Sequence, residues 1–413
     1  MQWFRKLARD TRGNILMIAG SGTMAMVGAA GIGVDTVQWY LWKRQMQQAV
    51  DSAALAGVLN IHQGFDWESA AEGEMERTAN TTYTIEQLTN PPTTGAYKGS
   101  NLAVEIVAIT QTELPFSSMF LPAAPTVRVR SVAASIQEGT NCVISLAPTG
   151  IGIDVAGDAD IDLGCGIVSN SGFSTAVDIT GSAKMKANPI SAHGGINAKS
   201  GTIPAGTTIL PYSQKVKDPL AERGLTAPTT PAGCTGGNNF TIKPKEVVEL
   251  DPGRYCNGLT IRGDAILNPG VYIIDGGSLK VNSQATITGD GVTFVLTGNG
   301  STVADVDISA GAKVTLSAPT SDEDAEWYDI LFFQEDGFSS ESVINGGSDM
   351  AVDGIFYFPS GDIRFNGNAG QDADCLLLIA NRVKMSGATA IKNNCPVEFD
   401  SYDQAARIIR VVE

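Results

Sequence analysis

The stretch LTIRGDAIL, residues 259–267, decides the fold of this chain because its pattern recurs along the second half of the sequence. Apolar residues alternate with other residues, a glycine lies in the middle, and an alanine follows two positions later. Alternation with a period of two predicts a short strand with one buried face. The central glycine predicts a bend, because glycine adopts positive φ at little cost.

The same frame, with small replacements, begins at residues 153, 177, 259, 279, 306, 363 and 383. Closely spaced copies are 20 to 27 residues apart, and a repeat of that length is typical of a solenoid. Leucine-rich repeats are excluded, since no L-x-x-L-x-L frame recurs. We therefore predict a right-handed parallel β-helix over residues 139–413, interrupted by an excursion over the proline-, glycine- and threonine-rich residues 204–257.

Composition narrows the classes of function. The chain has 413 residues, 46 glycines and a formal net charge of −16, which argues against a nucleic-acid partner. It has only 2 histidines, so most metal sites and acid–base schemes are excluded and no cofactor is expected.

The N-terminus predicts a membrane anchor. A basic leader, residues 1–14, precedes twenty uncharged, mostly apolar residues, 15–34, which as a helix would be about 30 Å long. The basic flank predicts a cytoplasmic N-terminus and a C-terminal part in the periplasm or at the cell surface. A cleaved signal peptide is the alternative, but the helical pattern continues without a break to residue 62, which favours a retained single-pass anchor. Small residues four apart predict a helix-packing face: Ser21, Ala25, Ala29 and Gly33.

All the cysteines lie after this segment, and their even number predicts disulfides outside the cytoplasm. Pairing of sequence neighbours would give Cys142–Cys165, Cys234–Cys256 and Cys375–Cys395, out of about fifteen possible pairings. The last two cysteines are 20 residues apart, like the repeats that begin at 363 and 383, so equivalent places on successive coils would bring them within bonding distance. No C-x-x-C spacing occurs, which argues against a zinc site.

Two stretches carry a family resemblance. RGNILMIAGSGTMAMVGAAGIGVD (12–35) with AVDSAALAG (49–57), and then VEIVAITQTELPFSSMFLPAAPTVRVRSVAAS (104–135), resemble TadG-like proteins of the tight-adherence (Flp) pilus system. The resemblance covers roughly residues 9–135 and implies an inner-membrane protein that serves pilus assembly or surface attachment. It also implies that residues 63–138 form a small α+β domain after the helix.

The sequence departs from that family at two points. Many relatives carry a von Willebrand-type domain with a D-x-S-x-S metal site, whereas DISAG at Asp307 lacks the second serine, so we predict that the β-helix replaces this domain. The pilin-like branch of the family is cleaved after a glycine and has Glu five residues on. Here the fifth residue after Gly13 is Ile18, which leaves cleavage after Gly13 open.

No motif predicts catalysis. Asp158, Asp160 and Asp162 alternate along one predicted strand, as the residues of a solvated strand face do. His193 lies beside glycines in SAHGG without the other elements of a polygalacturonase site, and we interpret it as a turn residue. We therefore expect a structural or adhesive protein, not an enzyme, whose partners are the inner membrane, other Tad pilus components and surface glycans. A β-helix polysaccharide lyase or hydrolase, or a calcium-dependent glycan-binding module, is the alternative.

Overall fold

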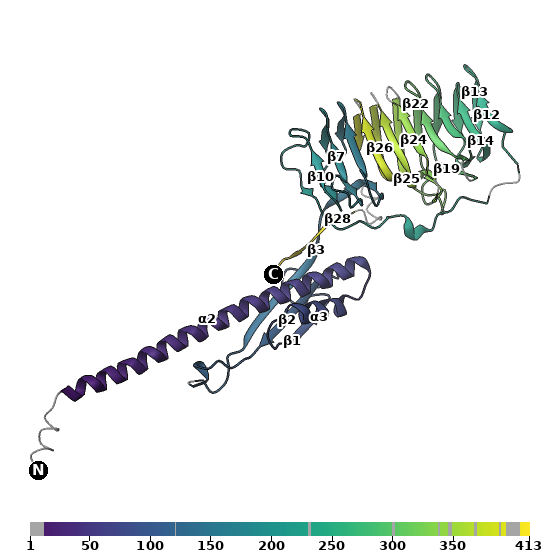
Figure 1. Ribbon diagram of the computed structural model, residues 1–413. Helices are drawn as coiled ribbons and strands as arrows, with labels where there is room; N and C mark the ends of the chain where they lie inside the picture. Colours follow the sequence, from purple (N-terminus) through teal and green to yellow (C-terminus); the bar gives the residue numbers. More distant parts are fainter. Residues whose placement is uncertain are drawn as a thin grey trace, which may run out of the picture. The chain divides into compact units, whose positions relative to one another are not determined.

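The computed structural model describes residues 12–119, 121–229, 233–299, 302–337, 339–345, 349–366, 370–387, 390–393 and 405–413. The chain is mainly β with one long N-terminal helix, as expected. It divides into two compact units, one formed by residues 1–136 and 408–413, and the other by residues 137–407. Figure 1 shows both units as ribbons. The parallel strands occupy the second unit.

The first unit is a small α+β structure. Helix α2 (Arg12–Gln63) is followed by α3 (Trp67–Thr78), β1 (Thr84–Thr89), β2 (Ala103–Thr110), the short helix η1 (Ser117–Met119) and β3 (Val127–Ser145). Strand β2 pairs antiparallel with both β1 and β3. Asp66 begins α3 by accepting a 3.1 Å hydrogen bond from the backbone N–H of Glu68, as an N-cap residue does.

Only the second half of α2 packs on this sheet. Its small and apolar residues Met46, Val50 and Ala53 are buried together with Val104 and Ile106 of β2. These helix residues are three and four apart, so they lie on one face of a helix with 3.6 residues per turn. Burial of that face stabilises the part of α2 that continues beyond the apolar run to Gln63.

The C-terminus returns to the first unit. Strand β28 (Ala405–Val411) leads into it, and the backbone N–H of Val412 then donates to the Val132 carbonyl at 2.8 Å. Val132 in turn donates to the carbonyl of Glu413 at 2.8 Å. The final residues thus extend the sheet next to β3. The prediction that all of residues 139–413 belong to the parallel β-helix is therefore wrong for these last residues.

The second unit consists of parallel strands closed around one apolar core. We call a set of up to three consecutive strands a rung when each strand pairs with the equivalent strand of the neighbouring set. The first rungs contain the end of β3 with β4 (Ile153–Ala156) and β5 (Asp160–Asp162), then β6 (Gly166–Ser169), β7 (Val177–Ile179) and β8 (Lys184–Lys186), then β9 (Ile190–Ala192) and β10 (Ile196–Ala198). Strand β11 (Ile209–Leu210) pairs with β9.

The remaining rungs begin at the opposite end. They contain β12 (Asn238–Ile242), β13 (Val247–Leu250), β14 (Gly253–Ile261), β15 (Asp264–Leu267), β16 (Gly270–Asp275), β17 (Ser278–Val281), β18 (Thr286–Gly289), β19 (Val292–Asn299), β21 (Asp305–Ile308), β22 (Lys313–Ser317), β23 (Ile330–Gln334), β24 (Glu341–Asn345), β25 (Asp349–Asn366), β26 (Gly370–Ser386) and β27 (Ala390–Asn393). The short β20 (Thr302–Val303) forms an antiparallel hairpin with β19.

The order of rungs in space differs from their order in the sequence. Strands β26 and β27 pair with β3, β4 and β5, so the last rung of the second series joins the first rung of the first series. In Figure 1, β10 and β12 accordingly lie at opposite ends of the strand stack. Residues 211–237 connect the two ends. This connection is shorter than the predicted excursion 204–257, because β11, β12 and β13 already pair within the stack.

The repeat frame matches the observed register in most copies. Ile153 pairs with Val177 and Ile161 with Met185, so the whole frame is aligned between the first two rungs. Leu259 likewise pairs with Leu279, but Ala265 pairs with Ile287 two positions beyond the frame, because the second turn is two residues longer. The apolar places of the frame face the common core.

An aromatic ladder runs through that core and was not predicted. The rings of Phe240, Tyr255, Tyr272, Phe294, Phe332 and Phe356 contact one another in sequence, with centroids 4.8 to 6.0 Å apart. Tyr272, Phe294, Phe332 and Phe356 are register partners on successive strands. Phe240 and Tyr255 extend the ladder from positions that are offset in register. Aromatic pairs at these distances add to the stability gained from burial, so the ladder reinforces the stack along its axis.

The outer face of the same strands is also apolar. Ile144, Ile273, Val295 and Ile379 belong to a second buried cluster that residues 216–227 of the connecting segment cover with Leu220. Polar contacts hold this crossing segment in place. Tyr357 donates from its hydroxyl to Asp218 at 2.7 Å, and the Asn170 side chain exchanges two 2.9 Å hydrogen bonds with the Val216 backbone.

Candidate functional site: helix α2 and the loop beside it

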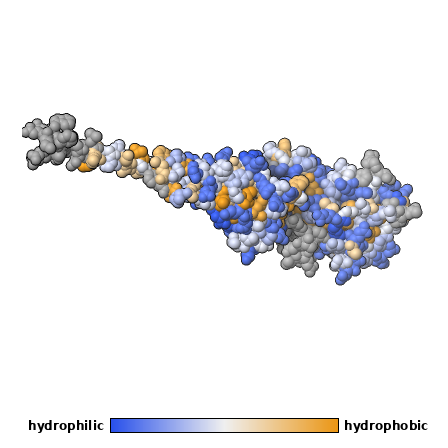
Figure 2. All heavy atoms as spheres, turned by 90° about the horizontal axis from the view of Figure 1, so that it is seen from below, coloured by the Kyte–Doolittle hydropathy of each residue, from blue (hydrophilic) through white to orange (hydrophobic). Residues whose placement is uncertain are grey.

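The first half of α2 leaves large apolar side chains uncovered. Exposed fractions reach 80% at Met17, 81% at Met24 and 60% at Val27. Figure 2 shows hydrophobic residues along this part of the helix. The helix is long and apolar enough to cross a membrane, with only 6% of its most apolar 18-residue window buried. Such exposure is unfavourable in water and favourable in a hydrocarbon layer.

The predicted small-residue face lies on this exposed part. Ser21, Ala25, Ala29 and Gly33 are all exposed, and a Cβ added to Gly33 would meet no atom within 4 Å. Ser21 donates from its hydroxyl to the Met17 carbonyl at 2.8 Å, as serines within helices do. Packing of this face against a second helix stays a prediction.

The loop between β2 and β3 packs against α2 near the end of the apolar run. The side chain of Phe116 lies on Gly31, where an added Cβ would come within 2.4 Å of the ring. Four residues further along α2, the carboxylate of Asp35 is 1% exposed and accepts hydrogen bonds from the backbone N–H groups of Phe116 at 3.1 Å and Ser117 at 2.5 Å. Asp35 therefore fixes the loop to the helix, a role that the sequence analysis missed.

A buried ion pair lies at the centre of the small sheet. Glu105 on β2 is 1% exposed and accepts a 2.6 Å hydrogen bond from Arg130 Nε on β3. Burial by itself would raise the pKa of Glu105, but hydrogen bonds from Arg130, Thr93 and Thr94 outweigh it and hold the pKa below its usual value. Arg130 also donates to the Glu413 side chain at 2.8 Å, which connects this pair to the C-terminus.

Two of the predicted disulfides are present in the second unit. Cys142 and Cys165 have Cα atoms 5.8 Å apart, and Cys234 and Cys256 have Cα atoms 5.5 Å apart. The third predicted pair, Cys375–Cys395, lies outside the residues whose side chains the structure describes.

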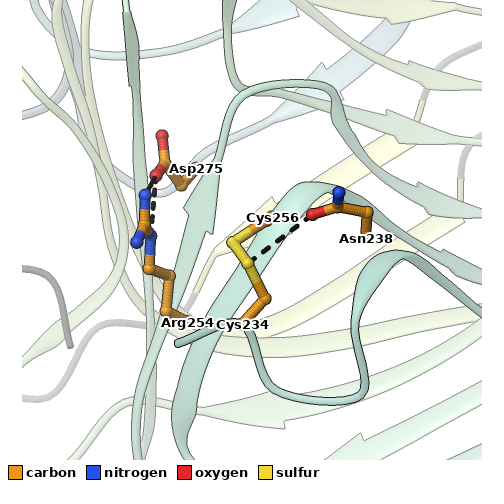
Figure 3. The surroundings of a disulfide bond; sticks show 5 residues. All are labelled: Cys234, Asn238, Arg254, Cys256 and Asp275. Atoms are coloured by element: carbon orange, nitrogen blue, oxygen red, sulfur yellow. Dashed lines mark hydrogen bonds and ion pairs between the residues drawn. A yellow bond between two sulfur atoms is a disulfide. The ribbon is translucent and has the colours of Figure 1, made fainter. Parts of the chain in front are cut away.

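The second disulfide attaches the crossing segment to a rung. Figure 3 shows that Cys256 of β14 reaches back to Cys234, next to an ion pair in which Arg254 Nε lies 2.7 Å from Asp275 Oδ2. Because Cys234 is near the end of residues 211–237, the bond fixes the point at which the chain enters the second series of rungs. The pairing had been predicted because the two cysteines are neighbours among the six in the sequence, and their separation of 22 residues is close to one repeat.

The wall of the stack carries paired charges. Asp160 and Asp162 are exposed, and Asp162 forms a 3.0 Å ion pair with Lys186 that raises the pKa of the lysine. His193 is held by a 3.0 Å hydrogen bond between its Nδ1 and the Ser213 carbonyl. In the part of the chain that the structure describes, no three His, Cys, Asp or Glu side chains are grouped as metal ligands.

A shallow pocket of about 300 Å³ crosses the junction between the two series of rungs. Its carboxylates are each balanced by a neighbouring cation: Asp154 by Lys384 at 3.4 Å, Asp362 by Arg382 at 3.7 Å, and Glu341 by Arg364. Ion pairs between successive rungs are the ordinary surface of stacked parallel strands.

These features define a class of protein in which one helix of membrane-spanning length precedes a small α+β unit and a larger parallel-stranded unit. Residues 13–60 match the family model described as "Putative Flp pilus-assembly TadE/G-like", so this part of the chain is similar to TadE/G-like proteins. The match confirms the resemblance of the first stretch and supports a role related to pili, whereas the resemblance of residues 104–135 stays a prediction. The match covers most of α2, including Asp35 and the small-residue face.

The other comparisons add little. No curated protein matches the chain. Among solved structures, the competence-associated pilin ComZ from Thermus thermophilus is similar at 12% identity, over 94% of this chain and 95% of that chain, with a TM-score of 0.31. A score of this size is too low to indicate a shared fold.

Proposed function

We propose that this chain is a single-pass inner-membrane protein of the Tad (Flp) pilus system, with a cytoplasmic N-terminus, which presents a rigid parallel-stranded domain outside the cytoplasm. The observation that carries the proposal is the coincidence of the TadE/G-like match, residues 13–60, with the exposed apolar half of α2. The basic leader supports the orientation, because positively charged flanks remain in the cytoplasm. The two disulfides support an oxidising compartment for the second unit.

The role of the parallel-stranded unit is structural or adhesive in this proposal. Its strands wind as a right-handed parallel β-helix, the hand that parallel crossovers usually take. A stack reinforced by an aromatic ladder and a covered outer face is stiff, which suits display towards other pilus components or surface glycans. The paired charges on its wall favour this role over polysaccharide cleavage.

Deletion and complementation in the bacterium that encodes the chain test this proposal. We expect deletion to reduce surface pili and attachment, and the intact gene to restore both. A variant with Met24→Arg and Val27→Arg should leave the membrane fraction and fail to restore pili, since charges in a spanning segment are costly. The matched control, Gln45→Arg with Gln48→Arg, adds the same charge to exposed positions of α2 beyond the apolar run and should complement.

Two further measurements address orientation and chemistry. Protease added to spheroplasts should degrade the second unit, and its protection would contradict the proposed orientation. Purified full-length chain, incubated with acidic polysaccharides with and without calcium, should release no reducing or unsaturated ends. Steady release of such ends would contradict the structural role and indicate an enzyme.

A further inference from the structure

The β2–β3 loop, residues 111–126, has an apolar tip. Exposed fractions are 37% at Phe116, 75% at Met119 and 44% at Leu121. No charged residue occurs between Glu113 and Arg128. A loop of a soluble domain normally exposes polar residues, so this composition indicates an apolar environment.

The tip lies against the helix turns that form the candidate membrane span. An apolar groove of about 870 Å³ is lined by Phe116 and Met119 together with α2 residues between Gly20 and Ile32. If these turns of α2 are in hydrocarbon, the side chains that contact them are at the same depth.

Contacts with α2 and hydrogen bonds within the loop hold the β2–β3 loop in this position. Asp35 accepts hydrogen bonds from the backbone of the loop. Gly31, which lies four residues before Asp35 and about 6 Å from it along the helix axis, has no side chain and leaves room for the Phe116 ring. Within the tip, the backbone N–H of Ser118 donates to Leu114 at 3.0 Å and that of Leu121 donates to Ser117 at 2.8 Å. Internally satisfied backbone groups are what an irregular segment needs at membrane depth.

We propose that the β2–β3 loop inserts Phe116, Met119 and Leu121 into the bilayer beside α2, and that lipid acyl chains fill the groove between them. The inference rests on the proposed single-pass anchor. Its consequence is a second attachment of the small α+β unit to the membrane, which restricts the tilt of α2 in the bilayer and holds that unit close to the membrane surface.

Thiol accessibility tests the proposal on the full-length chain in lipid nanodiscs. Three single substitutions are compared under non-reducing conditions with a membrane-impermeant maleimide, and the unsubstituted chain gives the background. Met119→Cys reports on the loop, and Met24→Cys, on the most exposed apolar residue of α2, reports on the anchor. Phe65→Cys is the matched control, because Phe65 is apolar, 66% exposed and in the same unit, but lies beyond the end of α2.

We expect Met24→Cys and Met119→Cys to react at least about tenfold more slowly than Phe65→Cys, and all three to react alike after denaturation in SDS. Slow reaction at position 24 with fast reaction at position 119 overturns the inserted loop and leaves the anchor intact. Fast reaction at position 24 overturns the proposed anchor itself. Should Met119→Cys fail to fold, Leu121→Cys replaces it.

The identity of the occupant is tested by the same assay. Protection of position 119 by lipid is independent of protein density, so it should persist with one chain per nanodisc. Protection that appears only at high density would indicate a second copy of this chain. Protection that appears only after addition of membrane extract would indicate another protein. Either result overturns the assignment to lipid.

Discussion

Replacement of Glu105 by Gln should destabilise the small sheet of the first unit, so that strands β2 and β3 separate more often. Glu105 accepts hydrogen bonds from Arg130 Nε at 2.6 Å, from the backbone N–H of Thr93 at 2.8 Å and from the Thr94 hydroxyl at 3.0 Å. Gln would keep the shape but remove the charge and place a donor where acceptors are required. Breaking a buried, hydrogen-bonded ion pair in this way costs about 3 kcal/mol.

The assay is hydrogen exchange of the full-length chain in detergent, followed by mass spectrometry of peptides from β2 and β3. A loss of about 3 kcal/mol corresponds to a roughly hundredfold larger opening constant, and exchange in these strands should accelerate by that factor. Peptides from the second unit should be unchanged. The control is Glu86→Gln, which removes an exposed 2.7 Å pair with Arg128 on the same sheet and should change exchange by about twofold.

The pH dependence gives an independent check. Because folding lowers the pKa of Glu105, its stabilising contribution is present above the unfolded-state pKa and is lost as pH falls through the lower folded-state pKa. The difference between the natural chain and Glu105→Gln should therefore be constant near neutrality and shrink below about pH 4. A difference of less than about 0.5 kcal/mol at neutral pH would refute the reasoning.

Three further predictions concern the second unit. Tyr357→Phe removes the hydroxyl that donates to Asp218, should cost about 1 to 2 kcal/mol, and should make residues 211–237 more sensitive to limited proteolysis. Cys256→Ser breaks the bond to Cys234, which closes a loop of 22 residues, and should cost about 3 kcal/mol in urea unfolding. Gly181→Ala places a Cβ 2.6 Å from a neighbouring carbonyl at φ +73° and should lower the thermal midpoint, at a cost of at least about 2 kcal/mol.

Much of the fold was predictable because it is encoded locally. The uncharged run 15–34 specifies a helix of membrane length, and α2 includes all of it. Alternating residues such as Leu259 and Ile261 specify strands with one face inward, and both are fully buried. The spacing of Cys142 and Cys165 is close to one repeat, so neighbouring rungs bring the two residues together.

The candidate site was less predictable. In the sequence, Asp35 only marks the end of the apolar run 15–34. Its hydrogen bonds to the backbone of Phe116 and Ser117 join positions about 80 residues apart. Glu105 and Arg130 lie within strands whose charged residues could equally have faced water. Local sequence patterns do not predict which distant backbone N–H group or cationic side chain a carboxylate will bind.

The sequence by itself determined the helix, the strand period and the buried faces, and it indicated disulfides between cysteines that are neighbours in the sequence. The tertiary structure alone decided that β26 and β27 join β3, β4 and β5, that residues 216–227 cover an apolar outer face, and that Glu413 returns to the small sheet. The physical reason is that every rung offers nearly the same backbone hydrogen bonds and apolar rows at its edge. Which edges meet is therefore set by the packing of the whole chain.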